Sequence, residues 1–129
     1  MQKILFEHFE KMMSFDVAAH SACIEVEFRV DDSPVYNACW LGKTFDRMTR
    51  QAVYWYGLVP DGSQAYDCDS LHEFVDMPVF NGKSIKDIWD SIAIFSIDNC
   101  DVDSRLAQYI GSAPMHVMGS AGFCSRPKL

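Results

Sequence analysis

The sequence predicts an α+β fold, a mostly antiparallel sheet of four to five strands with an N-terminal helix and short C-terminal helices packed on it. Residues 24–30 alternate strictly between apolar and polar side chains, which is typical of a half-buried antiparallel strand. Leu5, Phe9 and Met12 recur at helical spacing near the N-terminus. Because the chain of 129 residues has the length of one domain, these elements should share one core.

The first half of the chain predicts three strands after that helix. Turn residues at 31–34 follow the alternating segment, and a second strand at 35–41 completes a hairpin. Residues 42–51 are polar and predict a solvated loop. The basic residues of that loop are Lys43, Arg47 and Arg50. The third strand, at 52–59, is apolar on both faces, which predicts an internal strand that is covered on both sides, by helices or by a partner.

The second half predicts shorter elements. A turn precedes a short fourth strand at 64–68. Ser70 and Glu73 form a capping box that begins a short helix, and Ser84 begins another. The apolar stripe of this second helix is Ile85, Ile88, Trp89 and Ile92. A last strand is expected at 93–97.

A terminal helix should begin at Asp101 or Asp103. From residue 111 onward, glycine, proline and small residues show no period. We therefore expect one α+β domain over residues 1–110 and an irregular or mobile C-terminal tail over residues 111–129.

The charge of the chain is acidic and unevenly distributed. The net charge is −7, and in residues 61–103 ten acids oppose only Lys83 and Lys86, which gives that stretch a net charge of −8. Such a field repels phosphate backbones, so direct nucleic-acid binding is not expected. A basic protein surface is the partner that this charge favours.

The cysteines and the N-terminus predict a cytoplasmic protein. Five cysteines, an odd number, are spaced widely, which argues against a disulfide scaffold. Glu7 and Glu10 interrupt the apolar residues near the N-terminus, so no secretory segment is expected. The longest apolar run, residues 52–59, is too short to span a bilayer as a helix, and no membrane association is expected.

Catalytic, metal and cofactor motifs are weak. Paired metal knuckles, a phosphate loop and a nucleophile elbow are all missing from the sequence. Asp67 and Asp69 have the spacing of calcium ligands, but turn and capping roles explain them better. Glu25 and Glu27 share one strand face, which fits either acid–base chemistry or a solvated outer face. We therefore expect no cofactor and no metal, and the sequence favours a non-enzymatic protein.

Aromatic and acidic residues supply the candidate surface. Tryptophan and tyrosine dominate interface hot spots, and the third strand has one face more than a single core needs. The candidate interaction surface comprises Trp40, Tyr54, Trp55, Tyr56, Asp61, Asp67, Asp69, Asp87 and Asp90. A homodimer through the aromatic sheet face is one way to cover it.

Two hypotheses of function follow. The leading one is an acidic, non-enzymatic protein-interaction module, such as a regulator, an inhibitor or an immunity-type protein. The alternative is a small-molecule-binding or enzymatic α+β domain with a pocket between sheet and helices. A pocket converging on Glu25, Glu27, Tyr36 or Trp40 would favour the alternative. A flat acidic face beside exposed aromatic side chains would favour the first.

Overall fold

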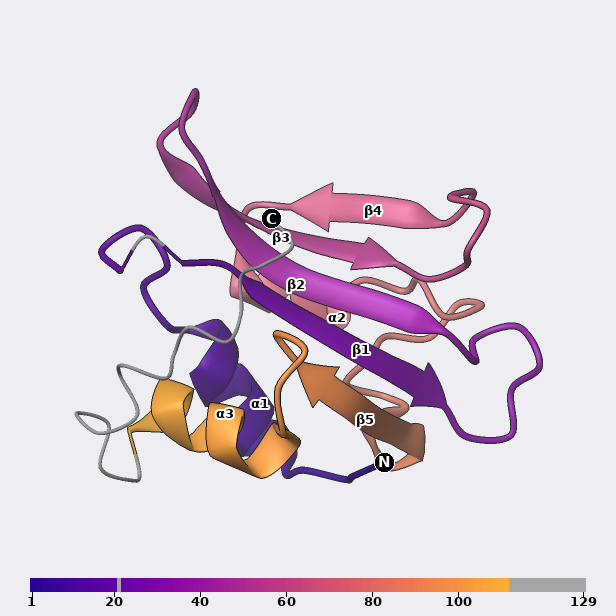
Figure 1. Ribbon diagram of the computed structural model, residues 1–129. Coiled ribbons are helices and arrows are strands. Elements are labelled where there is room, and N and C mark those ends of the chain that lie inside the picture. The colour runs from indigo at the N-terminus through magenta and orange to yellow at the C-terminus, as the bar shows by residue number, and fades with distance from the viewer. Residues whose placement is uncertain (21, 112–129) are drawn as a thin grey trace.

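The computed structural model describes residues 1–20 and 22–111 of the chain. Within these residues, one five-stranded antiparallel sheet in the order β4-β3-β2-β1-β5 carries the helices (Figure 1). The elements are α1 (Phe6–Met13), β1 (Ile24–Val30), β2 (Cys39–Asp46), β3 (Gln51–Gly57), β4 (Ala65–Cys68), α2 (Leu71–Asp76), the short 3₁₀ turn η1 (Trp89–Ser91), β5 (Ile92–Ile97) and α3 (Val102–Ile110). The predicted α+β class is confirmed. The tail predicted at 111–129 lies outside the described residues, except for Gly111, which ends α3.

The core lies between one face of the sheet and the helices. Phe9 of α1, Phe74 of α2 and Leu106 of α3 belong to a single buried cluster with the inward side chains of the strands. None of the described helices crosses the front of β2 and β3 in Figure 1. The strand β3 is internal, between β4 and β2, as predicted. Its outward residues are half-buried, and no described helix covers them, so of the predicted covers, helices or a partner, a helix is present on the inner face only.

The predicted loop at residues 42–51 is largely strand. β2 runs to Asp46, and only residues 47–50 form the turn to β3. Lys43 lies in β2 and is buried rather than solvated. Its ammonium donates to the backbone oxygens of Met13, at 2.8 Å, and Phe15, at 2.7 Å, and lies 5.0 Å from the ring centre of Tyr54. These acceptors satisfy the charge, so a polar residue continues the strand inside the core.

The second strand also begins later than predicted. Residues 35–38 belong to an irregular loop, and β2 starts at Cys39. Asp32 adopts a left-handed backbone with a φ of 62°, and the backbone N–H of Val30 donates to the oxygen of Tyr36 at 2.8 Å. This wide loop replaces the tight hairpin that the turn residues suggested.

The helix predicted to begin at Ser84 does not form. Ser84 and Asp87 do form reciprocal capping bonds, at 3.0 and 3.1 Å, but the chain then makes turns and the three-residue η1. The indole N–H of Trp89 donates to the oxygen of Ile4 at 2.7 Å, and the ring packs 4.7 Å from that of Phe9. These contacts hold Trp89 against α1. The 3₁₀ turn ends at Ser91, and Ile92 is the first residue of β5.

The two remaining helix starts agree with their capping signals. The hydroxyl of Ser70 accepts from the N–H of Glu73 at 3.1 Å, and α2 begins at the next residue after Ser70. The carboxylate of Asp101 accepts from the N–H of Ser104 at 3.0 Å and caps α3. Asp101, rather than Asp103, is therefore the cap of the terminal helix.

A buried cluster around Asp98 joins α3 to the sheet. Asp98 follows β5, and its carboxylate accepts from the backbone N–H of Glu25 at 2.8 Å, from Nε of Arg105 at 2.8 Å and from the hydroxyl of Tyr109. The side chains of Asp98 and Arg105 are 0% and 8% exposed. Burial, and then the neighbouring Asp98 charge, raise the pKa of Tyr109 well above its usual value, so its hydroxyl stays a donor.

The described cysteines are not all in the same covalent state. Cys39 and Cys68 are free, whereas Cys100 is disulfide-bonded. The spacing of the cysteines did not predict that bond. Cys124 lies outside the described residues. Among the described helices, none is long and apolar enough to cross a membrane.

Replacing Asp98 with Asn tests the buried cluster. The Asp98→Asn variant keeps the side-chain shape and suits the left-handed φ of 56°, but it leaves Arg105 without its buried counter-charge. We expect the free energy of unfolding to fall by about 3–5 kcal/mol in urea titrations followed by circular dichroism. Asp32→Asn is the matched control, also left-handed but exposed, and should change stability by less than about 0.5 kcal/mol. A loss below about 1 kcal/mol at Asp98 would contradict the ion-pair role.

Candidate functional site

The open face of the sheet, which is the face turned away from the helices, carries two rows of paired residues. The antiparallel register sets Asp67, Trp55, Gly42 and Glu25 side by side across β4, β3, β2 and β1. The next row is Ala65, Gly57, Trp40, Glu27 and Ser96, from β4 to β5. Each tryptophan therefore has a glycine as one neighbour and a carboxylate close by in its own row.

The two glycines of these rows have opposite surroundings. The indole of Trp55 lies over Gly42, where an added Cβ would come within 2.6 Å of the ring and 2.2 Å of the backbone oxygen of Ile24. A Cβ added at Gly57 would meet no atom of residues 1–20 and 22–111 within 4 Å. Gly57 therefore forms the open floor between the two tryptophans, while the space above Gly42 is filled.

This floor lies in a groove, which we call the tryptophan groove. Its volume is about 520 Å³, and it opens on the sheet surface. The indoles of Trp40 and Trp55 are half-buried. The groove is lined by Glu25, Ala38, Trp40, Trp55, Gly57, Val59 and Pro60. Most of these side chains are apolar, so the groove offers flat aromatic and aliphatic surface with one carboxylate in its wall.

The charges along the two rows are predominantly negative. Glu25, Glu27 and Asp67 belong to the rows themselves. Arg29 lies on this face of β1, 3.4 Å from the carboxylate of Asp31, which it shares with Lys3 at 2.6 Å. An aromatic face beside carboxylates is an arrangement that attracts organic cations.

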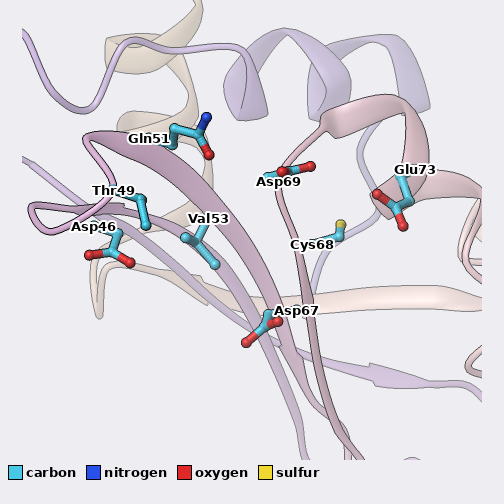
Figure 2. A pocket seen from close by; sticks show the side chains of 8 residues that line it. All are labelled: Asp46, Thr49, Gln51, Val53, Asp67, Cys68, Asp69 and Glu73. Carbon is cyan, nitrogen blue, oxygen red and sulfur yellow. The ribbon is translucent and has the colours of Figure 1, made fainter.

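A second hollow, the acidic recess, lies between the β2–β3 turn and the start of α2. It is about 460 Å³ in volume. Its lining residues are Asp46, Thr49, Gln51, Val53, Asp67, Cys68, Asp69 and Glu73 (Figure 2). The carboxylates in Figure 2 come from separate elements and spread around the rim. Among the described residues, no three acidic, histidine or cysteine side chains are grouped closely enough to hold a metal ion.

The remaining candidate residues are dispersed. Tyr54 and Tyr56 point into the core, and the hydroxyl of Tyr56 donates to the oxygen of Phe74 at 2.9 Å. Asp61 lies in the turn after β3, where bonds from Ser63 hold its pKa below the usual value.

Asp87 and Asp90 precede β5, at the opposite edge of the sheet from Asp67 and Asp69 on the β4 side. Bonds from Ser84 lower the pKa of Asp87, which acts as a capping residue. The structure thus brings Trp40, Trp55 and Asp67 onto one face, and it separates the acids of the β4 edge from those of the β5 edge.

Glu25 and Gly57 complete the site, and neither was among the candidate surface residues. The sequence suggested Glu25 for acid–base chemistry, a solvated face or a small-molecule pocket. Gly57 had no signal except its place inside an apolar strand, where a glycine is unfavourable. That signal indicates a close approach of backbone or ligand, but it does not say which.

Comparisons with known proteins add no assignment. The chain matches no protein-family model, no curated protein and no solved structure.

The two glycines allow a paired stability test. Gly42→Ala should lower the free energy of unfolding by about 1–3 kcal/mol or more, because the new Cβ meets backbone and an indole. Gly57→Ala should be neutral or raise it by about 0.4–1 kcal/mol, since the site is open and its φ is not positive. Urea titration of both variants measures the difference. Equal effects at the two positions would contradict the open floor.

Cys68 in the acidic recess should be a poor nucleophile. Burial, followed by the charges of Glu73, Asp69 and Asp67, raises the pKa of its thiol. At pH 8 we expect Cys68 to react with iodoacetamide more slowly than a cysteine in an unstructured peptide, as followed by mass spectrometry. Glu73→Gln should speed the reaction, and Asp76→Asn on the same helix should not. A rate above that of the peptide would contradict this prediction.

Proposed function

We propose that this protein is a non-enzymatic binding module that docks a partner protein on the open face of its sheet, over the tryptophan groove. The observation that carries the proposal is the pair of half-buried indoles, Trp40 and Trp55, flanking an open floor at Gly57 on a face that no described helix covers. Half-buried tryptophans around a recess are the side chains that anchor protein interfaces.

The opposite layer supports the same conclusion. The space between sheet and helices, where the alternative hypothesis put a pocket, is filled by fully buried side chains such as Phe9, Met12 and Phe28. A ligand there would have to displace close-packed core. The groove does include Glu25 and Trp40, two of the residues that would favour a small-molecule site, but it lies on the outer face.

A second candidate function uses the same groove. Its volume of about 520 Å³ is within the range of small-molecule sites, and its walls are mostly apolar. A small organic ligand would then occupy the floor at Gly57 in place of a partner side chain. Substitution at Gly57 tests both candidates, because either occupant needs the space above it.

A peptide library tests the proposal directly. The full chain is titrated against an array of 15-residue peptides of varied charge and hydrophobicity, and so is Gly57→Val, whose side chain fills the floor. We expect the wild-type protein to bind a subset of peptides and Gly57→Val to lose at least about tenfold in affinity. Thr44→Val, on the same face of β2 but outside the groove, is the control and should bind as the wild type does.

Two results would contradict partner docking. Peptides that bind Gly57→Val and Trp55→Ala as well as they bind the wild type would place the interaction elsewhere. If no peptide binds, but a metabolite library yields a compound that raises the melting temperature of the wild type and not of Gly57→Val, the small-molecule function is correct instead.

A further inference from the structure

Resting on that proposed function, we propose that a disulfide bond between Cys100 and Cys124 holds the last residues of the sequence, 125–129, over the tryptophan groove. A partner protein then has to displace this segment, so the bond regulates access to the site. The observation behind this inference is the covalent state of Cys100, which belongs to a disulfide bond.

The identity of the second sulfur follows from the cysteine count. The sequence contains five cysteines. Within one chain, Cys124 is the cysteine that remains for Cys100, because the other three carry thiols: Cys23, Cys39 and Cys68. The backbone N–H of Cys100 donates to the oxygen of Ile97 at 2.8 Å, which fixes its position after β5. Cys100 is half-buried and therefore accessible to a segment that approaches from outside the core.

The chain between the two cysteines is long enough to close this bond. Helix α3 begins two residues after Cys100, and its nine residues carry the chain about 14 Å along the helix axis. The twelve residues 112–123 can extend to about 40 Å. The chain can therefore return to Cys100 while α3 keeps its place against the core.

Formation of the bond requires an oxidant, and a low-molecular-weight disulfide of the glutathione class supplies it. The thiolate of one cysteine attacks a sulfur of that disulfide, which gives a mixed disulfide and releases one small thiol. The thiolate of the other cysteine then attacks the protein sulfur of the mixed disulfide and releases the second small thiol. The two cysteines thus lose two protons and two electrons, which the small disulfide gains. Excess small thiol reverses both steps.

The bond would anchor the segment close to the tryptophan groove. Two residues before Cys100, Asp98 donates its N–H to the oxygen of Glu25 at 2.7 Å and accepts from the N–H of Glu25 at 2.8 Å. Glu25 lines the groove, in the same row as Trp55. Neighbouring strands lie about 4.8 Å apart, so β3 is about 10 Å from β1. Because five extended residues span about 17 Å, residues 125–129 are long enough to cross this distance.

The charge of the C-terminal residues is opposite to that of the rest of the chain. The described residues hold all eighteen acidic side chains of the sequence, against nine basic ones. Residues 112–129 contain Arg126 and Lys128 and no acidic side chain. On the open face, Glu27 lies in one row and the exposed Asp67 in the other. Charge complementarity therefore favours this segment as the occupant of the open face.

A covalent tether makes weak contacts sufficient. A segment attached through a short linker reaches an effective concentration in the millimolar range at a nearby site. Contacts that are too weak to bind the same five residues as a free peptide can then keep the groove covered. A partner binds in competition with the segment, and loss of the bond raises the apparent affinity for the partner.

Peptide mapping tests the bond itself. The full chain is equilibrated with oxidised glutathione, its remaining thiols are blocked with iodoacetamide, and the monomer fraction is digested without reduction. Mass spectrometry should find the peptide of Cys100 linked to the peptide of Cys124, and Cys68→Ser should keep this link. A link from Cys100 to another cysteine or to a second copy, or its recovery as an alkylated thiol, would overturn the inference.

The NMR signals of the indole N–H groups test where the segment lies. Compared with the oxidised wild type, Cys124→Ser should shift the signals of Trp40 and Trp55, because the groove is uncovered. The signal of Trp89 should not move, since its N–H is bonded to the oxygen of Ile4. Reduction of the wild type with dithiothreitol should give the same shifts. Unmoved signals of Trp40 and Trp55 would show that the segment does not cover the groove.

A charge reversal separates the contact from the bond. The double variant Arg126→Glu, Lys128→Glu should keep the disulfide in peptide mapping and still shift the two groove indoles, because the acidic face repels the reversed segment. Ser120→Ala, which lies outside residues 125–129, is the control and should leave these signals in place. If the double variant behaves like Ser120→Ala, charge does not hold the segment and this part of the inference is wrong.

The array peptides separate the inference from the docking function. Peptides that bind the oxidised wild type should bind Cys124→Ser several-fold more tightly, because they no longer compete with the tethered segment. Equal affinities would overturn the regulatory role of the bond and leave the docking function intact. If the bond and the indole shifts are found but no peptide binds either protein, the tether stands and the docking function falls.

Discussion

The carboxylate of Asp98 is the contact on which the layered arrangement depends. It accepts bonds from the start of β1, through the backbone N–H of Glu25, and from Arg105 and Tyr109 of α3. One buried charge therefore joins the sheet to the last helix, and removing either partner would leave the other charge unpaired in the core. With α3 held there, all three helices lie on one side of the sheet. None of the described helices covers the outer face, and this is where the groove lies.

The sequence predicted those elements that depend on alternation or on capping residues within the element itself. The strict alternation at residues 24–30 corresponds to β1, and the capping residues Ser70 and Asp101 lie at the starts of α2 and α3. Lys43 could not be predicted in the same way. Its charge suggested a loop, but its ammonium is satisfied by the backbone oxygens of Met13, at the end of α1, and Phe15, just after it. A tertiary contact of this kind overrides a local propensity, and only the fold reveals it.

In the candidate site too, some features follow from the local sequence and others only from the tertiary structure. Aromatic content alone identified Trp40 and Trp55, but it included Tyr54 and Tyr56 as well. The alternation of β3 assigns these tyrosines to the opposite face, and which face is covered became clear only from the positions of the helices. The groove itself depends on register, because Gly42 and Gly57 look alike in the sequence. One is covered by an indole and the other is open.

Gly57 is the residue that packing does not explain. Glycine inside a strand weakens it, and a β-branched residue would be the better choice for stability. At Gly42 the close contacts with Trp55 and with the backbone of Ile24 require glycine. At Gly57 the described part of the chain makes no such contact, and the backbone does not adopt a positive φ. A residue that weakens the fold without a structural reason is typical of a functional position. The space that Gly57 leaves between two tryptophans, beside Glu25, is the feature of this molecule that a bound side chain would explain.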